Sequence, residues 1–531
     1  MKSVKSSNKT TLLQLFGSKQ YILLIALFIA TLNAFSNSSN IATTKGKTQI
    51  DFVLTVEDPS SHSVQVTLNY GGANTAHTTF KMPVWTPGYY QIMNYADQVS
   101  EFKVIDKASN EIKWEKTASN TWEVNNQKAK SFTITYKVKD KRAFVASNIV
   151  EEERTYLSPA GIFIFPVGEL TQASTLTIKP YKTWSTIATG LEPIKGASNK
   201  YSASNFDILY DSPILMGSKL ETLPVFYVKG IPHYFVGYNM GDFDKVQFIK
   251  DLSQIVESAA NIIGAIPYTH YTFLAIGPGG GGIEHLNSAS ISFSGKGLAT
   301  QAGRIKMYSF LAHEYFHHYN VKRIRPIELG PFDYDKGSPT KMLWVSEGLS
   351  VYYEYLVLRK AGIMSEDELL KAIGNDIAKF ENKPGKLYQS LTEASYNTWS
   401  DGPFGRTGDE VNKTISYYEK GPVVGAILDF AIRDASNNKK SLNDVMRSLY
   451  YEYYLNKKRG FTESEFQATC EKMAGAPLNE VFEYAATVKP LNYPKYFSLA
   501  GLRVDSTYTV QQQSEINAKA LNIRSAWFKQ D

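Results

Sequence analysis

Cysteine is nearly absent from this sequence, since Cys470 is the only one in 531 residues. A single thiol excludes an intramolecular disulfide and a thiolate-rich metal site, so any bound metal must rely on histidine and carboxylate ligands. Apolar residues make up 43% and charged residues 20% of the chain, a globular balance that excludes a disordered, collagen-like or polytopic membrane protein. Because one hydrophobic core rarely exceeds about 250–300 residues, the length predicts two or three domains.

Long apolar runs are equally scarce, and the notable one lies at Tyr21–Ala30. It follows a basic stretch without acidic residues and precedes Ala34, which is the order of a secretory signal peptide. The run is shorter than the roughly 20 apolar residues of a membrane span. We therefore predict that residues 1–34 are a signal peptide and that the protein is periplasmic or secreted. The alternative is a membrane anchor through uncleaved residues 21–34.

The excess of basic residues is small and unevenly placed. The formal net charge is +6, and residues 1–34 contribute four lysines and no acidic residue to it. Without this segment the chain is almost neutral, so we expect no nucleic-acid partner. We also expect no stable membrane partner unless the N-terminal segment remains uncleaved.

Residues 47–215 show the alternation of half-buried strands. Val64–Leu68 and Phe132–Val138 place apolar and polar residues in turn, with a period of two. Turn signals such as Pro87-Gly88 separate these segments. Several short strands at this spacing predict an N-terminal antiparallel β-sandwich domain.

Residues 216–490 change to a mainly helical pattern. Apolar residues recur at helical spacing within Val246–Ile263, and one short strand is expected at Tyr271–Ile276. Gly421-Pro422 predicts the first turn of a further helix, where proline is tolerated. The chain is therefore expected to be multidomain, with a β front half and an α-rich back half.

The strongest chemical signal is the motif His313-Glu314-x-x-His317. Its surroundings, Met307–Tyr319, contain neither glycine nor proline and are compatible with a helix. Two histidines four residues apart then project from one helical face and can bind one zinc ion. Glu314 lies beside the first ligand, where it can act on a water molecule as a general base. A buried helix with two merely structural histidines is the alternative.

A third metal ligand is needed, and two carboxylates follow the motif. Glu347 lies in the apolar, helix-compatible segment after Trp344, whereas Glu328 lies in a segment rich in proline, glycine and aspartate. We prefer Glu347 because a ligand is best held on a rigid element. Two histidines and one glutamate leave a fourth zinc position open, which is the arrangement of catalytic sites. The neighbouring His318 is rotated by about 100° around the helix and is not expected to bind this metal.

Together, the histidine motif and Trp344-Val-Ser-Glu347-Gly resemble the gluzincin aminopeptidases, and most of all the glycyl aminopeptidase family of bacterial zinc metallopeptidases. The segment Met82-Pro-Val-Trp-Thr-Pro-Gly-Tyr89 is similar to the N-terminal β domain of that family. The resemblance extends over residues from about 48 to 490. It implies that residues 216–490 form a thermolysin-like catalytic domain with Zn2+ bound by His313, His317 and Glu347.

The resemblance also implies two roles for residues outside the zinc motif. Gly281-Gly282-Ile-Glu284-His285 is similar to a motif whose glutamate binds the free α-amino group of the substrate, although the relatives have asparagine in place of His285. Tyr418 matches a tyrosine that donates a hydrogen bond to the oxyanion. Without the resemblance, Gly281 and Gly282 would be read as part of a flexible turn, and Tyr418 as a core residue.

These residues predict a zinc-dependent aminopeptidase that uses a metal-activated water, with Glu314 as the general base. The resemblance implies small N-terminal residues, glycine or alanine, in peptide substrates with a free N-terminus. A zinc endopeptidase on the same scaffold and a non-catalytic peptide-binding protein are the alternatives.

The family often ends in a PDZ domain, and Lys495–Val504 resembles the start of one. Residues 491–531 are too few for an independent core. We predict a C-terminal tail, with a possible vestigial PDZ segment, that is ordered on the helical domain.

Overall fold

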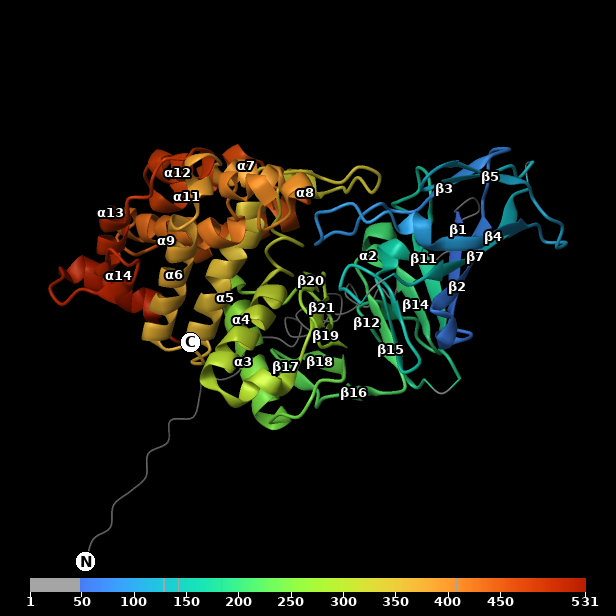
Figure 1. Ribbon diagram of the computed structural model, residues 1–531, viewed down its shortest axis with the longest axis horizontal. Helices are drawn as coiled ribbons and strands as arrows, with labels where there is room; N and C mark the ends of the chain where they lie inside the picture. The colour runs from blue at the N-terminus through green and yellow to red at the C-terminus, as the bar shows by residue number, and fades with distance from the viewer. Residues whose placement is uncertain (1–47, 128, 142, 183, 407) are drawn as a thin grey trace, which may run out of the picture. The chain divides into compact units, whose positions relative to one another are not determined.

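The computed structural model describes residues 48–127, 129–141, 143–182, 184–406 and 408–531. The predicted signal peptide, residues 1–34, lies outside the described residues. Thr48–Asp531 form one compact unit, in which strands gather in the first part of the chain and helices in the second (Figure 1).

The alternating segments of the front half build a seven-stranded sheet. Apolar residues of β2 and β7 are buried while their neighbours face outward, as the period of two predicts. In spatial order the strands are β13 (Glu192–Pro193), β14 (Lys200–Ala203), β11 (Ser174–Lys179), β1 (Gln49–Thr55), β2 (Ser63–Gly71), β7 (Ser131–Lys139) and β4 (Val99–Ile105).

Two smaller sheets accompany the seven-stranded sheet. One four-stranded sheet packs its buried residues, such as Phe80 and Trp122, into the same core as those of the large sheet, for example Phe132. Its strands are β10 (Phe165–Pro166), β3 (Thr78–Lys81), β6 (Thr121–Val124) and β5 (Trp114–Ala118). The other contains β12 (Thr186–Thr189), β15 (Ile214–Gly217), β9 (Arg154–Leu157) and β8 (Ile149–Val150).

The predicted antiparallel β domain contains one parallel pairing. Strands β1 and β11 pair in parallel, with Asp51 opposite Thr175. A parallel pair needs a long crossover connection, and here the chain between β1 and β11 supplies it. The period-two pattern is the same for both strand directions, so alternation alone cannot reveal this pairing.

A further sheet opens the catalytic half of the chain. Its strands are β16 (Leu220–Thr222), β17 (Phe226–Val228), β18 (Ile231–Tyr238), β19 (Tyr271–Gly277), β21 (Ser288–Ser292) and β20 (Gly282–Glu284). The predicted strand Tyr271–Ile276 is confirmed as part of β19, which is buried throughout. Strand β20 pairs with β21 alone, so it forms an edge of the sheet.

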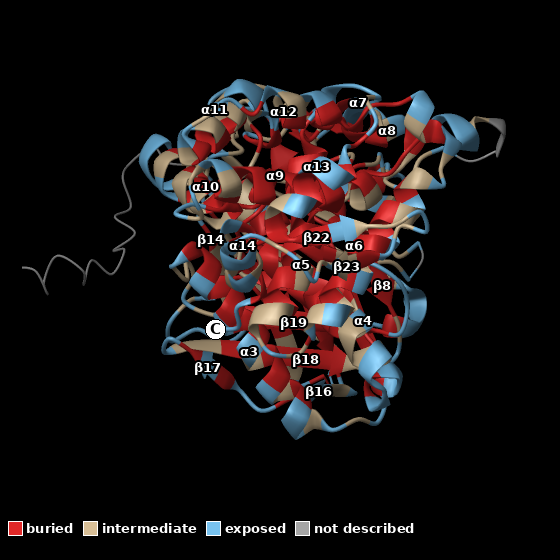
Figure 2. Ribbon diagram, turned by 90° about the vertical axis from the view of Figure 1, so that its left-hand side faces the viewer, coloured by how far each residue is buried: buried red, intermediate tan, exposed pale blue. Residues whose placement is uncertain are grey.

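Helices make up most of the remaining chain. They are α2 (Phe206–Tyr210), α3 (Lys245–Ile263), α4 (Gln301–Phe316), α5 (Leu349–Lys360), α6 (Glu366–Glu381), α7 (Leu391–Tyr396), α8 (Thr398–Asp401), α9 (Tyr417–Ala435), α10 (Leu442–Leu449), α11 (Glu463–Ala474) and α12 (Asn479–Ala486). Helix α3 confirms the helical spacing of Val246–Ile263. Helix α9 is buried over most of its length (Figure 2).

The prediction that Gly421-Pro422 begins a helix was wrong. Helix α9 begins earlier, at Tyr417, because the side chain of Ser416 caps it by accepting a hydrogen bond from the backbone N–H of Tyr418. Pro422 therefore lies inside the helix. The glycine before it has a packing role, since a Cβ on Gly421 would lie 2.6 Å from the Cα of Gly348. Glycine at both positions lets the two backbones approach closely.

Residues 491–531 fold onto the helices. They form α13 (Tyr493–Phe497), the paired strands β22 (Leu502–Val504) and β23 (Val510–Gln512), and α14 (Ala518–Phe528). The buried indole of Trp527 donates a hydrogen bond to the hydroxyl of Tyr352 on α5 (2.8 Å) and packs against Phe430 on α9. Among the described residues, no helix has both the length and the apolar character that crossing a membrane requires.

Candidate active site

The two motif histidines meet at the end of α4. His313 lies in its last turn and His317 is the residue that caps it. The Nδ1–H of His317 donates to the carbonyl of Asn320 (2.6 Å), so its Nε2 carries a lone pair. This Nε2 lies 2.8 Å from the Nε2 of His313. A proton or a metal ion between the two nitrogens makes so short a separation favourable.

Glu347 completes a three-ligand cluster. It lies in η6 (Trp344–Gly348), a π-helical turn that leads into α5. Its Oε2 is 3.2 Å from Nε2 of His317 and 3.7 Å from Nε2 of His313. A tetrahedral zinc ion with bonds of about 2.0–2.1 Å would separate its ligands by about 3.3 Å. The three buried donors therefore fit zinc in both type and spacing.

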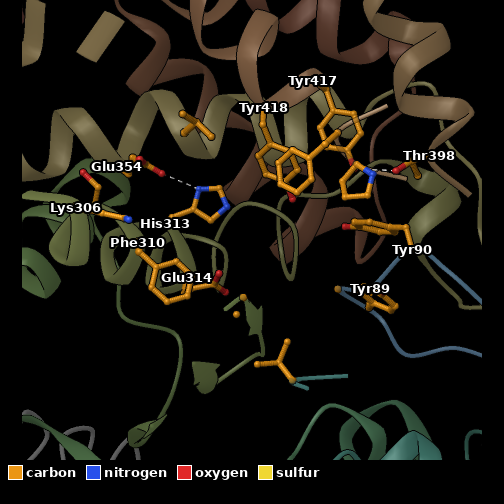
Figure 3. Close-up of a pocket in the computed structure, with 18 of the residues that line it drawn as sticks. Tyr89, Tyr90, Lys306, Phe310, His313, Glu314, Glu354, Thr398, Tyr417 and Tyr418 are labelled. Carbon is orange, nitrogen blue, oxygen red and sulfur yellow. Dashed lines mark hydrogen bonds and ion pairs between the residues drawn. The ribbon is translucent and has the colours of Figure 1, made fainter. Parts of the chain in front are cut away.

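A second carboxylate contacts the ring nitrogen of His313 that does not face the other ligands. The Oε2 of Glu354 on α5 lies 3.0 Å from Nδ1 of His313 (Figure 3). Carboxylates in this position fix the ring orientation of a metal-binding histidine. Sequence reasoning missed this role, although the spacing of seven residues from Glu347 corresponds to two helical turns and gives a usable signal.

The side chain of Glu314 lies close to Gly282. A Cβ at Gly282 would lie 2.3 Å from Oε1 of Glu314, so only glycine leaves room for this carboxylate. Its Oε2 has no hydrogen-bond partner within the described part of the chain. Burial raises the pKa of Glu314 to about 8, despite the opposing effect of His313 and His317. The raised pKa gives this carboxylate a higher proton affinity than an exposed glutamate has.

Two tyrosines contact Glu347 from different parts of the chain. The hydroxyl of Tyr418 donates to Oε2 (2.9 Å), and that of Tyr90 donates to Oε1 (3.1 Å). The close contact between Gly348 and Gly421 brings Tyr418 within reach. Burial raises the pKa of both tyrosines well above the ordinary value, so both phenols remain neutral hydrogen-bond donors. Although the two histidines hold the pKa of Glu347 down, burial acts against them.

Tyr90 comes from the β half of the chain, and sequence reasoning did not identify it. Its segment is fixed by Trp85, whose indole donates to the carbonyl of Asp333 (2.7 Å) and packs edge-on against Trp399. The ring of Tyr90 also packs against Trp399. No spacing relates Tyr90 to Glu347 in the sequence, because tertiary folding alone brings them together.

Glu284 lies at the end of the edge strand β20. Only 4% of the residue is exposed, and its Oε1 has no hydrogen-bond partner in the part of the chain that the structure describes. Gly88 approaches it so closely that a Cβ there would lie 2.9 Å from Oε2. The nearest cation is Lys322, with its Nζ 4.0 Å from Oε1. A buried carboxylate without hydrogen bonds is costly unless a positive group pairs with it.

The two rejected ligands lie away from this cluster. Glu328 is exposed and accepts a hydrogen bond from Thr340 (3.1 Å). His318 is fully buried and packs against Tyr268 and Tyr315 instead of joining the metal ligands. Burial and the neighbouring Arg323 lower the pKa of His318 well below the ordinary value, so its ring is neutral.

A pocket of about 660 Å3 runs along these residues. Figure 3 shows His313, Glu314, Tyr90 and Tyr418 around it. Gly281 and Gly282 form part of its wall. The volume exceeds that of a single amino acid and is suited to a peptide segment. Of the predicted residues, Gly281, Gly282, His313, Glu314 and Tyr418 line this cavity, whereas His317, Glu347 and Glu284 lie behind its wall.

Two family models match the sequence. The peptidase M61 N-terminal domain matches residues 51–218, and the M61 glycyl aminopeptidase matches residues 306–424. Together they contain Tyr90, the three metal ligands, Glu314 and Tyr418. No curated protein matches the sequence.

Several solved structures share the fold. An aminopeptidase N family protein from Idiomarina loihiensis superposes with a TM-score of 0.80 at 24% identity, over 86% of this chain and 79% of that chain. An M1 zinc metallopeptidase from Deinococcus radiodurans gives a TM-score of 0.51 at 13% identity, over 85% of this chain and 96% of that chain. A mutant of the latter protein, bound to a Tyr-Ser-Ala substrate, gives a TM-score of 0.52 at 13% identity, over 84% of this chain and 96% of that chain.

Proposed function

Because the chain belongs to the M61 glycyl aminopeptidase family and is a metallopeptidase, we propose that it is a zinc-dependent aminopeptidase. It removes a small N-terminal residue, glycine or alanine, from peptides. The observation that carries this proposal is the buried carboxylate of Glu284, whose Oε1 accepts no hydrogen bond from the described residues, close to the cluster of His313, His317 and Glu347. The family model supports the small residue.

His313, His317 and Glu347 would hold the zinc ion. When bound, zinc lowers the pKa of a water molecule towards about 7 and polarises the carbonyl group of the scissile bond. Glu354 and the carbonyl of Asn320 orient the two histidines. This arrangement would leave the Nε2 atom of each histidine free to bind the ion.

Glu314 moves the proton. Its unpartnered Oε2 accepts a proton from the attacking water and then delivers it to the nitrogen of the leaving amine. The absence of a Cβ at Gly282 gives this carboxylate the space to approach both groups.

Tyr418 stabilises the oxyanion. Its neutral hydroxyl leaves Oε2 of Glu347 and donates to the carbonyl oxygen of the substrate as negative charge develops there. One such donor typically contributes about 3–4 kcal/mol to the transition state. The hydroxyl is held close to the metal ligands by the packing of η6 against α9.

Glu284 selects the free N-terminus. A substrate ammonium group supplies the charged hydrogen-bond donor that Oε1 lacks, and this pairing fixes the first residue next to the catalytic groups. A blocked N-terminus has no charge and adds bulk where Gly88 already touches the carboxylate. Exopeptidase action follows from this single contact.

The test uses two versions of one peptide, with a free or an acetylated N-terminal alanine. The zinc-loaded protein should release alanine from the free peptide alone, and chelation should stop the release. Internal cleavage of both peptides at similar rates would show an endopeptidase. Peptide binding without any cleavage would show a non-catalytic binding protein.

We further propose that the protein acts in the periplasm or outside the cell, on peptides with a free N-terminus and without a nucleic-acid partner. The signal-like residues 1–34 support this proposal. Fractionation of expressing cells, with N-terminal sequencing of the recovered protein, checks it. A product that begins near residue 35 is expected, whereas an intact N-terminus in the membrane fraction would indicate an anchor.

A further inference from the structure

Glu284 belongs to a small buried cluster of charged residues. Asp211, Lys322 and His285 surround it, and each of these four residues is at most 8% exposed. Asp211 comes from the end of α2 in the β half of the chain. Lys322 follows the metal-binding helix α4 in the catalytic half. The cluster therefore joins the two halves directly behind the proposed substrate anchor.

The lysine in this cluster pairs with the aspartate rather than with the glutamate. Nζ of Lys322 lies 2.8 Å from Oδ1 of Asp211 but 4.0 Å from Oε1 of Glu284. Only the shorter distance is that of a charge-assisted hydrogen bond. Lys322 therefore forms its hydrogen bond with Asp211. Its ammonium group attracts Glu284 only weakly, from a longer distance.

Asp211 is itself firmly held. Its Oδ2 accepts the backbone N–H of Leu286 (2.7 Å), and its Oδ1 lies 3.1 Å from Nδ1 of His285. Burial raises the pKa of Asp211, but Lys322 and His285 outweigh it and hold the pKa at about 2. The aspartate is therefore ionised. Its contacts with His285 and Leu286 hold it against the segment that follows Glu284.

The hydrogen bonds of the cluster are unevenly distributed. Lys322 pairs with Asp211, which leaves Oε1 of the buried Glu284 carboxylate without a hydrogen-bond partner in the described part of the chain. If Lys322 were released, its flexible ammonium group would need to move only slightly to pair with Glu284. It would then occupy the position that a substrate ammonium needs.

We propose that Asp211 is a specificity-determining positioning residue. By holding Lys322, it keeps the carboxylate of Glu284 available for the α-ammonium group of a peptide substrate. The β half of the chain thereby sets the preference for a free N-terminus through a residue that does not touch the substrate. This inference rests on the proposed role of Glu284.

The first test is the substitution Asp211→Asn in the zinc-loaded, full-length mature protein. Asparagine keeps the size of the side chain and an acceptor for the N–H of Leu286, but it loses the charge that holds Lys322. We expect KM for an alanyl peptide amide to rise about tenfold, with kcat within about twofold of the parent. An unchanged KM would overturn the proposal.

The second test separates competition from simple damage to the fold. In the double variant Asp211→Asn/Lys322→Met, no ammonium group is left to compete for Glu284. KM should return towards the parent value, although the thermal unfolding temperature should be no higher than that of Asp211→Asn. A double variant with the same raised KM as the single variant would show a merely structural role.

The variant Glu284→Gln distinguishes failure of this inference from failure of the proposed function. If Glu284→Gln raises KM for the free peptide and Asp211→Asn does not, Glu284 binds the ammonium group but Asp211 does not control it. If Glu284→Gln leaves KM unchanged, the anchor itself is elsewhere and both proposals fall.

Discussion

The two halves of the chain surround the same pocket in different ways. The catalytic half supplies His313, Glu314, Glu347 and Tyr418 from helices or from the turn that leads into one. Among its described residues the β half supplies none to the metal cluster, but Tyr90 donates a hydrogen bond to Glu347. Helical spacing relates His313 to Glu314 within the first group, whereas tertiary contacts alone place Tyr90.

This difference suggests a division of labour. The helices carry the groups that bind metal and move protons, so their loss should abolish turnover. The β half contacts the carboxylates of the catalytic half. Tyr90 donates a hydrogen bond to Glu347, and Gly88 lies against Glu284. Its changes should alter metal affinity or substrate binding by smaller factors. The following predictions test this ranking.

Metal removal should have the largest effect. Dialysis against a chelator should reduce peptide hydrolysis to background, because His313, His317 and Glu347 then hold nothing that polarises the substrate. Added zinc should restore the rate in proportion to the metal content, measured by atomic absorption. Full activity in metal-free protein would show that the residues of the catalytic half do not act through a bound metal ion.

The substitution Glu314→Gln should come next. Loss of the proton acceptor should reduce kcat by about 10²–10⁴-fold, while zinc content stays at one ion per chain because Glu314 is not a ligand. Steady-state kinetics and metal analysis on the same preparation check both points. A zinc-loaded variant that retains more than about a tenth of the parent kcat would contradict the role of Glu314 as general base.

Tyr90→Phe tests whether the β half supports the metal centre. Removal of the hydroxyl should weaken zinc binding about 10–100-fold, because Glu347 loses an orienting hydrogen bond. Competition with a zinc chelator measures this directly, without an activity assay.

Tyr95→Phe is the matched control for Tyr90→Phe. It also removes a buried hydroxyl of the β half, whose hydrogen-bond acceptor is the carbonyl of Ala146 (2.7 Å) and not a metal ligand. It should reduce stability by about 1 kcal/mol and leave zinc affinity unchanged. Equal zinc affinities for the two variants would show that the contact of Tyr90 with Glu347 has no bearing on the metal.

Gly88→Ala should have the smallest effect on the site. A Cβ at this position would lie 2.7 Å from Ile283 and 2.9 Å from Oε2 of Glu284. We expect KM for free peptides to rise about three- to tenfold because Glu284 must shift.

Gly168→Ala isolates the contribution of backbone strain. Both glycines have positive φ, but a Cβ at Gly168 meets nothing within 4 Å. Both variants should lose about 1–2 kcal/mol of stability from the unfavourable backbone conformation. A raised KM in Gly168→Ala as well would attribute the effect to strain and not to contact with Glu284.

The sequence predicted the helical part of the site well. A spacing of four residues on one helix necessarily puts His313 and His317 together, and the structure places Glu347 beside both. The Gly421-Pro422 signal failed to locate the start of α9, since the capping residue Ser416 begins the helix before Pro422.

The contribution of the β half was beyond sequence reasoning. Tyr90, Asp211 and Glu347 are far apart in the sequence, and no periodicity relates residues that meet across two halves of a chain. Likewise, the parallel pairing of β1 with β11 depends on long-range topology that an alternating pattern does not encode. These features follow from packing and not from local spacing.

The most direct test of this account is the ratio of kcat/KM for a free to an N-acetylated alanyl peptide, measured for Glu284→Gln. The account predicts that this ratio falls towards one, while zinc content and thermal stability stay near those of the parent. A ratio equal to that of the parent enzyme would show that Glu284 does not select the N-terminus, and would contradict the account.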